Sequence, residues 1–223
     1  MPPIKAICFD MDGMLFNTEE LFDDVSLEVL RRRGRELDRG LVKRMMGLQS
    51  DLALQLFVDH YELPESVAAL KQETRDIFDR LLPTRLAPMP GAVELIERLT
   101  AEGTRPLALT TSSGAASVDR IMSICDLSVH FEFRLTAEDI DNSKPHPEIY
   151  LTAAARFGIS PNEMLVFEDS ENGCKAGVAA GAHVVAVPSK HGELHNFDGS
   201  LLVAVDLYDE RIDQHLKKHV ASC

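Results

Sequence analysis

Asp10-Met11-Asp12-Gly13 directly follows a short apolar run at residues 4–9. An apolar run of that length, rich in β-favouring residues and ended by carboxylates and a glycine, predicts a buried strand with acidic groups at its carboxyl end. Open α/β sheets bind their ligands at that end of their strands. Two carboxylates two residues apart point to the same side of an extended chain, so Asp10 and Asp12 can both face one substrate or one hard cation.

The acidic pair also has two simpler interpretations. An isolated Asp-x-Asp-Gly can be no more than a solvated acidic turn. A calcium loop of the EF-hand type begins in the same way, but it needs a glycine at its sixth position and a glutamate at its twelfth. Those positions hold Leu15 and Leu21, which argues against the calcium loop. A functional site requires further partners for the pair elsewhere in the chain.

The composition of the 223-residue chain limits the possible functions. It is long enough for a large domain, or for a core domain with an insert, and its apolar content of 45% is ordinary for a globular protein. Lys and Arg number 23 against 36 Asp and Glu, which gives a net charge of -13. We therefore expect no extended surface for nucleic acid or an anionic membrane, and an anionic substrate would need local positive charge or a metal.

The four cysteines, Cys8, Cys125, Cys174 and Cys223, match no metal-binding spacing and suit a reducing compartment. The sequence opens with no leader pattern, and no apolar run approaches the roughly 20 residues that span a bilayer. We expect a soluble, cytoplasmic protein, with a monomer as the default state.

Residues 18–82 have helical patterns with no convincing strand, which predicts a four-helix insert. The first helix is expected to bury a face made of Leu21, Val25, Leu27 and Leu30. The basic turn at residues 31–33 is interpreted as a solvated helix end, with an anion site as the alternative. Three prolines, Pro83, Pro88 and Pro90, indicate a linker that returns from the insert.

After this linker the chain alternates helix and strand. Strands are expected at residues 106–111, 131–135, 164–167 and 183–187, with helices between them. Ser160-Pro161-Asn162-Glu163 has the form of a capping box with proline at the first helical position. Such alternation predicts an α/β fold with a parallel sheet that is covered on both faces and includes the first strand.

Three further polar groups follow strands of this sheet. Thr110-Thr111-Ser112-Ser113-Gly114 opens a helix and offers hydroxyl and backbone N–H groups to a phosphate. Lys144 precedes a helix that starts with proline, and Glu168-Asp169 ends a strand. Taken singly, the hydroxyl cluster is interpreted as a helix cap, Lys144 as a surface charge and Glu168-Asp169 as an acidic cap of a helix. Together they place four acids, one cation and a group of hydroxyls on one edge of one sheet.

With these motifs the chain resembles the haloacid dehalogenase superfamily, in the branch whose cap is inserted after the first strand. Asp10-Met11-Asp12-Gly13 matches the first motif, Thr111 the second, Lys144 the third and Glu168-Asp169 the fourth. The resemblance implies a Rossmann-like core of residues 1–14 and 88–223 and a helical cap of residues 15–87.

The resemblance also implies a magnesium-dependent phosphatase that acts on a small phosphorylated metabolite. Asp10 would be the nucleophile that forms an aspartyl-phosphate, and Asp12 the general acid and base. Lys144 would span Asp10 and the phosphate, while Thr111 and the N–H of Ser112 would hold a phosphate oxygen. Mg²⁺ would be bound by Asp10, the backbone carbonyl of Asp12 and Asp169, with Glu168 acting through water.

Family members differ in the reaction that they catalyse. Dehalogenases lack an acid at the position of Asp12, so its presence favours phosphate chemistry. A mutase like β-phosphoglucomutase needs basic cap residues for a second phosphate, and Phe22 and the loop at residues 45–50 carry none where they are expected. The mutase is thus the alternative function, and a non-catalytic binding protein on the same fold is a third. The cap residues expected to contact substrate are Thr18, Glu19, Phe22, Gly47, Leu48 and Gln49.

Overall fold

The computed structural model describes residues 2–45, 50–189 and 195–218. The chain divides into two compact units, Met1–Asn17 with Ala87–Cys223, here called the core, and Thr18–Leu86, here called the cap. The expected boundaries after residue 14 and before residue 88 differ from these by three residues and one residue. Asn17 and Ala87 explain the difference, because their backbones and the Asn17 side chain join the two connecting segments by hydrogen bonds of 2.8 and 3.1 Å.

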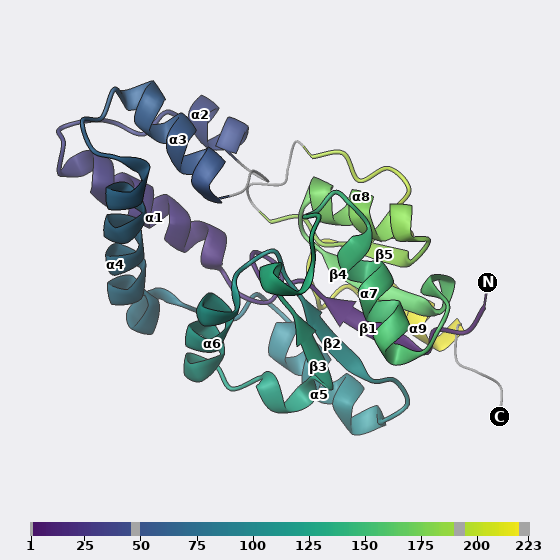
Figure 1. The fold of residues 1–223 in the computed structure, drawn as a ribbon. Helices are drawn as coiled ribbons and strands as arrows, with labels where there is room; N and C mark the ends of the chain where they lie inside the picture. The colour runs from purple at the N-terminus through teal and green to yellow at the C-terminus, as the bar shows by residue number, and fades with distance from the viewer. Residues whose placement is uncertain (1, 46–49, 190–194, 219–223) are drawn as a thin grey trace. The chain divides into compact units, whose positions relative to one another are not determined.

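The core contains a six-stranded parallel sheet in the order β3-β2-β1-β4-β5-β6 (Figure 1). Its strands are β1 (Ala6–Phe9), β2 (Leu107–Thr110), β3 (Phe133–Leu135), β4 (Met164–Glu168), β5 (His183–Ala186) and β6 (Leu202–Val203). This topology confirms the predicted Rossmann-like α/β fold. The strand order reverses at β1, which lies between β2 and β4, and ligands of such sheets bind beside this point.

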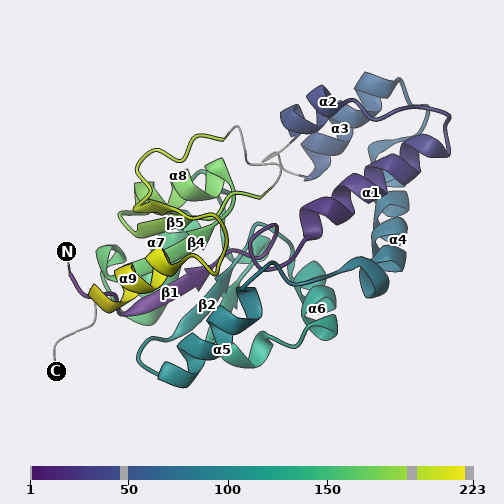
Figure 2. The same cartoon turned by 180° about the vertical axis from the view of Figure 1, so that it is seen from behind.

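Helices cover both faces of the sheet, as predicted. They are α5 (Ala92–Glu102), α6 (Ala115–Ile124), α7 (Glu148–Phe157), α8 (Glu171–Ala180) and α9 (Glu210–Lys218), with short 3-10 helices η1 (Ser128–His130), η2 (Ala137–Asp139) and η3 (Pro161–Glu163). α7 and α8 lie on one face (Figure 1), and α5 and α9 lie on the other (Figure 2). The expected capping box at Ser160 and Glu163 is present and starts η3.

The central strands are buried on both faces, which is why their sequences are continuous apolar runs. Phe9 of β1 and Phe167 of β4 are partners in register, and their rings stack with centroids 4.7 Å apart. This packing fixes the ends of both strands at the same level. The next residue on each strand, Asp10 and Glu168, is therefore delivered to the same edge of the sheet.

The cap consists, within the described residues, of four helices: α1 (Thr18–Arg31), α2 (Arg39–Met45), α3 (Ser50–Tyr61) and α4 (Val67–Arg85). Leu21, Val25 and Leu30 are buried in it, but Leu27 is 44% exposed, so the expectation that it belongs to the buried face was wrong. Pro83 lies inside α4 rather than in a linker. It is tolerated there because it stands in the last turn, where a proline removes one helical hydrogen bond close to the helix end.

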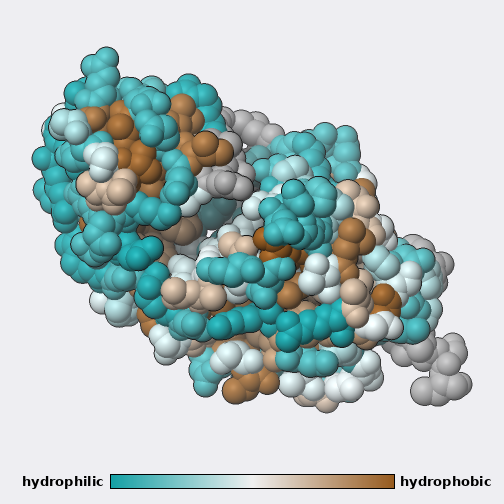
Figure 3. All heavy atoms as spheres, in the orientation of Figure 1, coloured by the Kyte–Doolittle hydropathy of each residue, from teal (hydrophilic) through white to brown (hydrophobic). Residues whose placement is uncertain are grey.

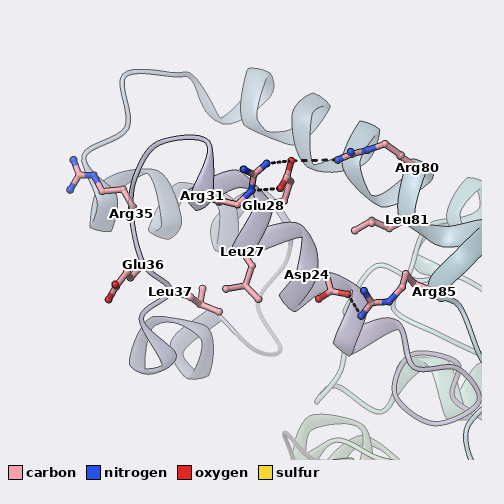
Figure 4. Close-up of a pocket in the computed structure, with 10 residues that line it drawn as sticks. All are labelled: Asp24, Leu27, Glu28, Arg31, Arg35, Glu36, Leu37, Arg80, Leu81 and Arg85. Atoms are coloured by element: carbon pink, nitrogen blue, oxygen red, sulfur yellow. Dashed lines mark hydrogen bonds and ion pairs between the residues drawn. The ribbon is translucent and has the colours of Figure 1, made fainter.

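Leu27 lines a surface hollow of about 490 Å³ on the cap (Figure 4). Charged side chains surround it, and several are paired: Asp24 with Arg85 at 2.7 Å, and Glu28 with Arg31 at 2.8 Å. In the view of Figure 3, hydrophobic side chains lie among hydrophilic ones on the cap. Among the helices that the structure describes, none has the length and hydrophobicity needed to cross a bilayer.

The basic turn at residues 31–33 is more than a solvated helix end. Arg31 and Arg32 bind Glu28, and Arg33 donates to Glu65 at 2.9 Å and to Glu73 at 2.6 Å. The Arg33 side chain is 16% exposed, whereas that of Arg31 is 74% exposed. Arg33 thus joins the end of α1 to α4 and to the loop before it.

We predict that Arg33→Ala lowers the free energy of unfolding by about 1–3 kcal/mol, because Glu65 loses its arginine donor and Glu73 keeps only its longer contact with Arg32 at 3.1 Å. Arg31→Ala is the matched control and should cost much less, since exposed ion pairs contribute little. Chemical denaturation of both variants measures the difference. Equal losses would show that Arg33 does not join the cap helices.

Candidate active site

The carboxyl edge of the core sheet gathers the predicted polar residues from three neighbouring strands. Asp10 follows β1, Thr111 follows β2, and Glu168 ends β4, with Asp169 next to it. Lys144 reaches the same place from the segment before α7. All five are buried, although each is polar or charged. Buried groups of this kind are stable only when they are paired, so their contacts decide how the edge is built.

The Lys144 ammonium is the centre of this cluster. Its Nζ donates to Asp10 Oδ1 at 2.6 Å, to Glu168 Oε1 at 2.6 Å and to the backbone carbonyl of Thr110 at 3.1 Å. These three contacts use all three protons of the ammonium group. Lys144 therefore links the ends of β1, β2 and β4, and its direction is fixed by the acceptors on all three.

The charges of the cluster determine its protonation. Burial alone would lower the pKa of Lys144, but the negative charges of Asp10 and Glu168 outweigh it and raise that pKa, so the ammonium stays protonated. The pKa of Asp10 is raised well above its usual value, first by burial, which exceeds the opposing effect of Lys144, and further by Glu168 and Asp12. The ionised form of Asp10 therefore needs additional positive charge nearby to be favoured.

Asp10, Glu168 and Asp169 form a candidate metal site. Each offers a carboxylate oxygen, and these atoms lie within 4.8 Å of one another. Oxygen ligands at such close range suit a hard divalent cation such as Mg²⁺, which is commonly held by one or two carboxylates together with water and substrate. The donor set therefore fits the cofactor that the sequence predicts.

Asp12 is held by hydroxyl groups from the segment after β2. Its Oδ2 accepts from Ser113 Oγ at 2.7 Å and from Thr111 Oγ1 at 3.0 Å. The hydroxyl of Thr111 in turn accepts from the backbone N–H of Ser113 at 3.0 Å. The second and first motifs are thus in direct contact, and the sequence did not reveal that Ser113 binds Asp12.

The start of α6 differs from the expected phosphate cradle. The Ala115 N–H, in the first turn, donates to Glu138 Oε2 at 2.9 Å. An added Cβ at Gly114 would lie 2.9 Å from Glu138 Oε1. Within the stretch at residues 110–114 that was expected to offer N–H groups to a phosphate, the N–H of Ser113 is taken by the Thr111 hydroxyl, and the Glu138 carboxylate occupies the next turn. Ser112, whose N–H was expected to hold a phosphate oxygen, is exposed.

Glu168 is held by residues that the sequence did not indicate. Its Oε1 accepts from the Tyr150 hydroxyl at 2.5 Å, and its Oε2 accepts from Ser170 Oγ at 3.1 Å. Its carboxylate also lies against Gly173 of α8, where an added Cβ would be 1.9 Å from the carboxyl carbon. In the sequence, Tyr150 stands where α7 places apolar core residues, so it was not selected as a site residue. A tyrosine at a buried position usually needs a hydrogen-bond partner for its hydroxyl, and this rule could have indicated its polar contact.

The predicted site residues thus fall into three groups. The core edge brings together Asp10, Asp12, Thr111, Lys144, Glu168 and Asp169, with Ser112 next to Thr111 in the chain. Thr18, Glu19 and Phe22 lie on α1 of the cap, where Phe22 is 47% exposed and stacks on Phe78. Gly47, Leu48 and Gln49 lie outside the described residues.

We predict that Gly173→Ala lowers the activity of the site by about 10²-fold, because the new methyl group must displace the Glu168 carboxylate and with it Lys144. Gly177→Ala, on the same helix, is the matched control, since its Cβ would meet Val184 at 2.7 Å and would reach the ring of Tyr150 only at 3.8 Å, an ordinary contact distance. Both should unfold more easily, but only Gly173→Ala should lose turnover in the folded protein. Turnover that falls equally in both would contradict this role of Gly173.

Comparison with known proteins agrees with this geometry. The family model described as "Haloacid dehalogenase-like hydrolase" matches residues 7–187. A Drosophila melanogaster protein named "Probable pseudouridine-5'-phosphatase" is 34% identical over 212 residues, which are 92% of this chain and 91% of that protein. The "Phosphorylated carbohydrates phosphatase" of Thermotoga maritima is 29% identical over 201 residues, 90% of each chain.

A solved structure is similar over nearly the whole chain. CbbY from Rhodobacter sphaeroides, a mutant in complex with xylulose-1,5-bisphosphate, has a TM-score of 0.78 and 25% identity, with 90% of this chain and 93% of that chain covered. The match of the family model includes the first strand and the segments that carry Thr111, Lys144 and Glu168. This chain therefore belongs to the family of haloacid dehalogenase-like hydrolases.

Proposed function

We propose that this protein is a magnesium-dependent phosphatase that hydrolyses a small phosphorylated metabolite through an aspartyl-phosphate on Asp10. The chain is a phosphoric monoester hydrolase of its family, since relatives named as phosphatases match it over about nine tenths of both chains. The observation that carries the finer proposal is the position of Lys144 between Asp10 and Glu168, beside Asp169. A cation among carboxylates at this edge supports the proposal, because phosphoryl transfer depends on positioning and on compensation of negative charge.

Phosphoryl transfer needs in-line geometry and compensation of negative charge more than it needs reactive groups. Asp10 is the proposed nucleophile, and its Oδ1 is fixed by Lys144 at 2.6 Å. Lys144 also offers positive charge to an incoming phosphate. The N–H of Ser112 and the hydroxyl of Thr111 would hold an equatorial oxygen and stabilise its charge as the transition state forms. Thr111 would turn its one proton from Asp12 to the phosphate, while Ser113 keeps Asp12 in place.

Asp12 is the proposed general acid and base. It would protonate the leaving oxygen of the ester and then take a proton from the water that attacks the aspartyl-phosphate. Its Oδ2 is held by the hydroxyls of Ser113 and Thr111, which fix the direction of the carboxylate. Assistance of this kind is typically worth about 10² to 10⁴ in rate.

Asp10, Asp169 and the backbone carbonyl of Asp12 would hold the magnesium ion, with Glu168 as an outer partner. When bound, the ion supplies the charge neutralisation that lets an anionic carboxylate approach a phosphate dianion. This need agrees with the raised pKa of Asp10. Burial and the neighbouring acids disfavour the ionised form of this carboxyl, and a further cation would favour it.

The proposed substrate is a sugar phosphate or nucleoside phosphate. The relatives named above are described as phosphatases of phosphorylated carbohydrates and of pseudouridine 5'-phosphate. Thr18, Glu19, Phe22, Gly47, Leu48 and Gln49 of the cap would select the leaving group. The exposed ring of Phe22, stacked on Phe78, offers an apolar surface and no charge for a second phosphate, which favours a phosphatase over a mutase.

We predict that the purified protein with Mg²⁺ releases phosphate from at least one member of a panel of sugar and nucleoside monophosphates. Asp10→Asn, which preserves the shape of the side chain but not its nucleophilicity, should reduce the release to background. Equal release by wild type and variant, or no release at all, would contradict the proposal and favour a binding protein. Isomerisation of a sugar 1-phosphate, primed with the bisphosphate, that outpaces release would identify a mutase instead.

We predict that chelation of divalent cations abolishes activity and that Mg²⁺ restores it. Asp169→Asn should raise the Mg²⁺ concentration for half-maximal activity by at least about tenfold, since even outer partners of a metal site have effects of that size. Asp126→Asn is the control, because Asp126 is exposed, does not belong to the candidate metal site and accepts a local hydrogen bond from Ser128 at 2.8 Å. Activity that persists at full strength in chelator would rule out the metal requirement.

A further inference from the structure

Tyr150 is a buried group that none of the proposed catalytic steps uses. It lies on α7 in the hydrophobic layer beneath the sheet and is fully buried. Its hydroxyl donates to Glu168 Oε1 at 2.5 Å, the same oxygen that accepts from Lys144 at 2.6 Å. The face of its ring lies 5.2 Å from the Lys144 ammonium. Tyr150 therefore touches both the cation and one of its two carboxylate partners.

The shared oxygen makes the two donors competitors. An acceptor that already receives one strong hydrogen bond has less negative charge to offer a second donor. The Tyr150 hydroxyl thus weakens the attraction of Glu168 for Lys144, without adding a charge to the site. Burial, followed by the charge of Glu168, raises the pKa of Tyr150 well above its usual value, so the hydroxyl keeps its proton and remains a donor.

The geometry of Glu168 leaves it little freedom. Ser170 donates to Oε2, and Gly173 leaves room for the carboxylate where a larger residue would not. Lys144 and Tyr150 occupy Oε1 from two sides. Lys144 also donates to Asp10, the proposed nucleophile. The strength of its hydrogen bond to Glu168 relative to that to Asp10 therefore sets how firmly the ammonium is held at Asp10.

We propose that Tyr150 is a positioning residue, whose hydroxyl shares Glu168 Oε1 with Lys144 and thereby keeps the ammonium directed at Asp10. The same hydrogen bond holds Glu168 Oε1 away from the metal ion. This inference rests on the proposed phosphatase function. Without the hydroxyl, Glu168 Oε1 has Lys144 in place of two competing donors, binds it more strongly and draws it away from Asp10, and the freed side of this oxygen can turn to a cation in the neighbouring site.

Tyr150→Phe tests the proposal, because it removes the hydroxyl and keeps the ring that faces Lys144. We expect kcat to fall by about five- to 20-fold with a substrate KM within twofold of wild type, since the hydroxyl contacts Glu168 and not the substrate. In the metal-free protein, titration calorimetry with Mg²⁺ alone should show tighter binding, by about two- to fivefold. A general loosening of the site would weaken both turnover and metal binding, so opposite directions identify positioning.

Tyr208→Phe is the matched control, because it removes a tyrosine hydroxyl bound to a carboxylate, Glu94 at 2.8 Å, elsewhere in the core. It should change neither kcat nor the affinity for Mg²⁺. Tyr150→Phe with wild-type kcat, or with unchanged or weaker Mg²⁺ binding, would overturn the inference. Wild-type protein that releases no phosphate would instead refute the proposed function, while the calorimetric comparison would still decide whether Tyr150 restrains Glu168.

Discussion

The Lys144 ammonium lies between carboxylates at the carboxyl edge of the sheet that would otherwise repel one another. Asp10, Glu168 and Asp169 are buried with carboxylate oxygens within 4.8 Å of one another, and burial together with the neighbouring acids raises the pKa of Asp10. Lys144 compensates part of this charge through short hydrogen bonds to two of the three strands that meet there. The remaining negative charge is what makes the site suited to a divalent cation and, through it, to a phosphate.

The arrangement follows from the fold in a few physical steps. Apolar runs in β1 and β4 bury these strands at the middle of the sheet, and the stacked rings of Phe9 and Phe167 fix their register. Asp10 and Glu168 then emerge at the same level, at the point where the strand order reverses. The position of Glu168 is fixed by contacts with Tyr150, Ser170 and Gly173. The layer of α7 and α8 therefore orients a site residue as well as stabilising the sheet.

Much of this could be predicted from the sequence, because the relevant signals are local. Continuous apolar runs predicted the buried strands, and the capping box at Ser160 was confirmed. The strand ends predicted which acids would share one edge, and Lys144, which was also expected there, reaches it from the segment before α7. The two-residue strand β6 carries too short a pattern to be seen, and Pro83 was misinterpreted because a proline in the last helical turn looks like a linker. The contacts of Tyr150, Ser113 and Gly173 were missed since they depend on distances between helices and strands that no local pattern encodes.

The account's central claim is that the buried carboxylate of Asp10 receives the phosphoryl group. An Asp12→Asn variant lacks both the proposed acid and the proposed base, so with an aryl phosphate, whose leaving group needs no proton, it should accept that group and release it slowly. The direct measurement is acid quenching of this variant at short times with Mg²⁺ and a good substrate, followed by mass spectrometry of the peptide that contains Asp10. The account predicts a phosphoryl group on Asp10 that appears before phosphate is released. Release of phosphate with no phosphorylated peptide at any quench time would contradict it.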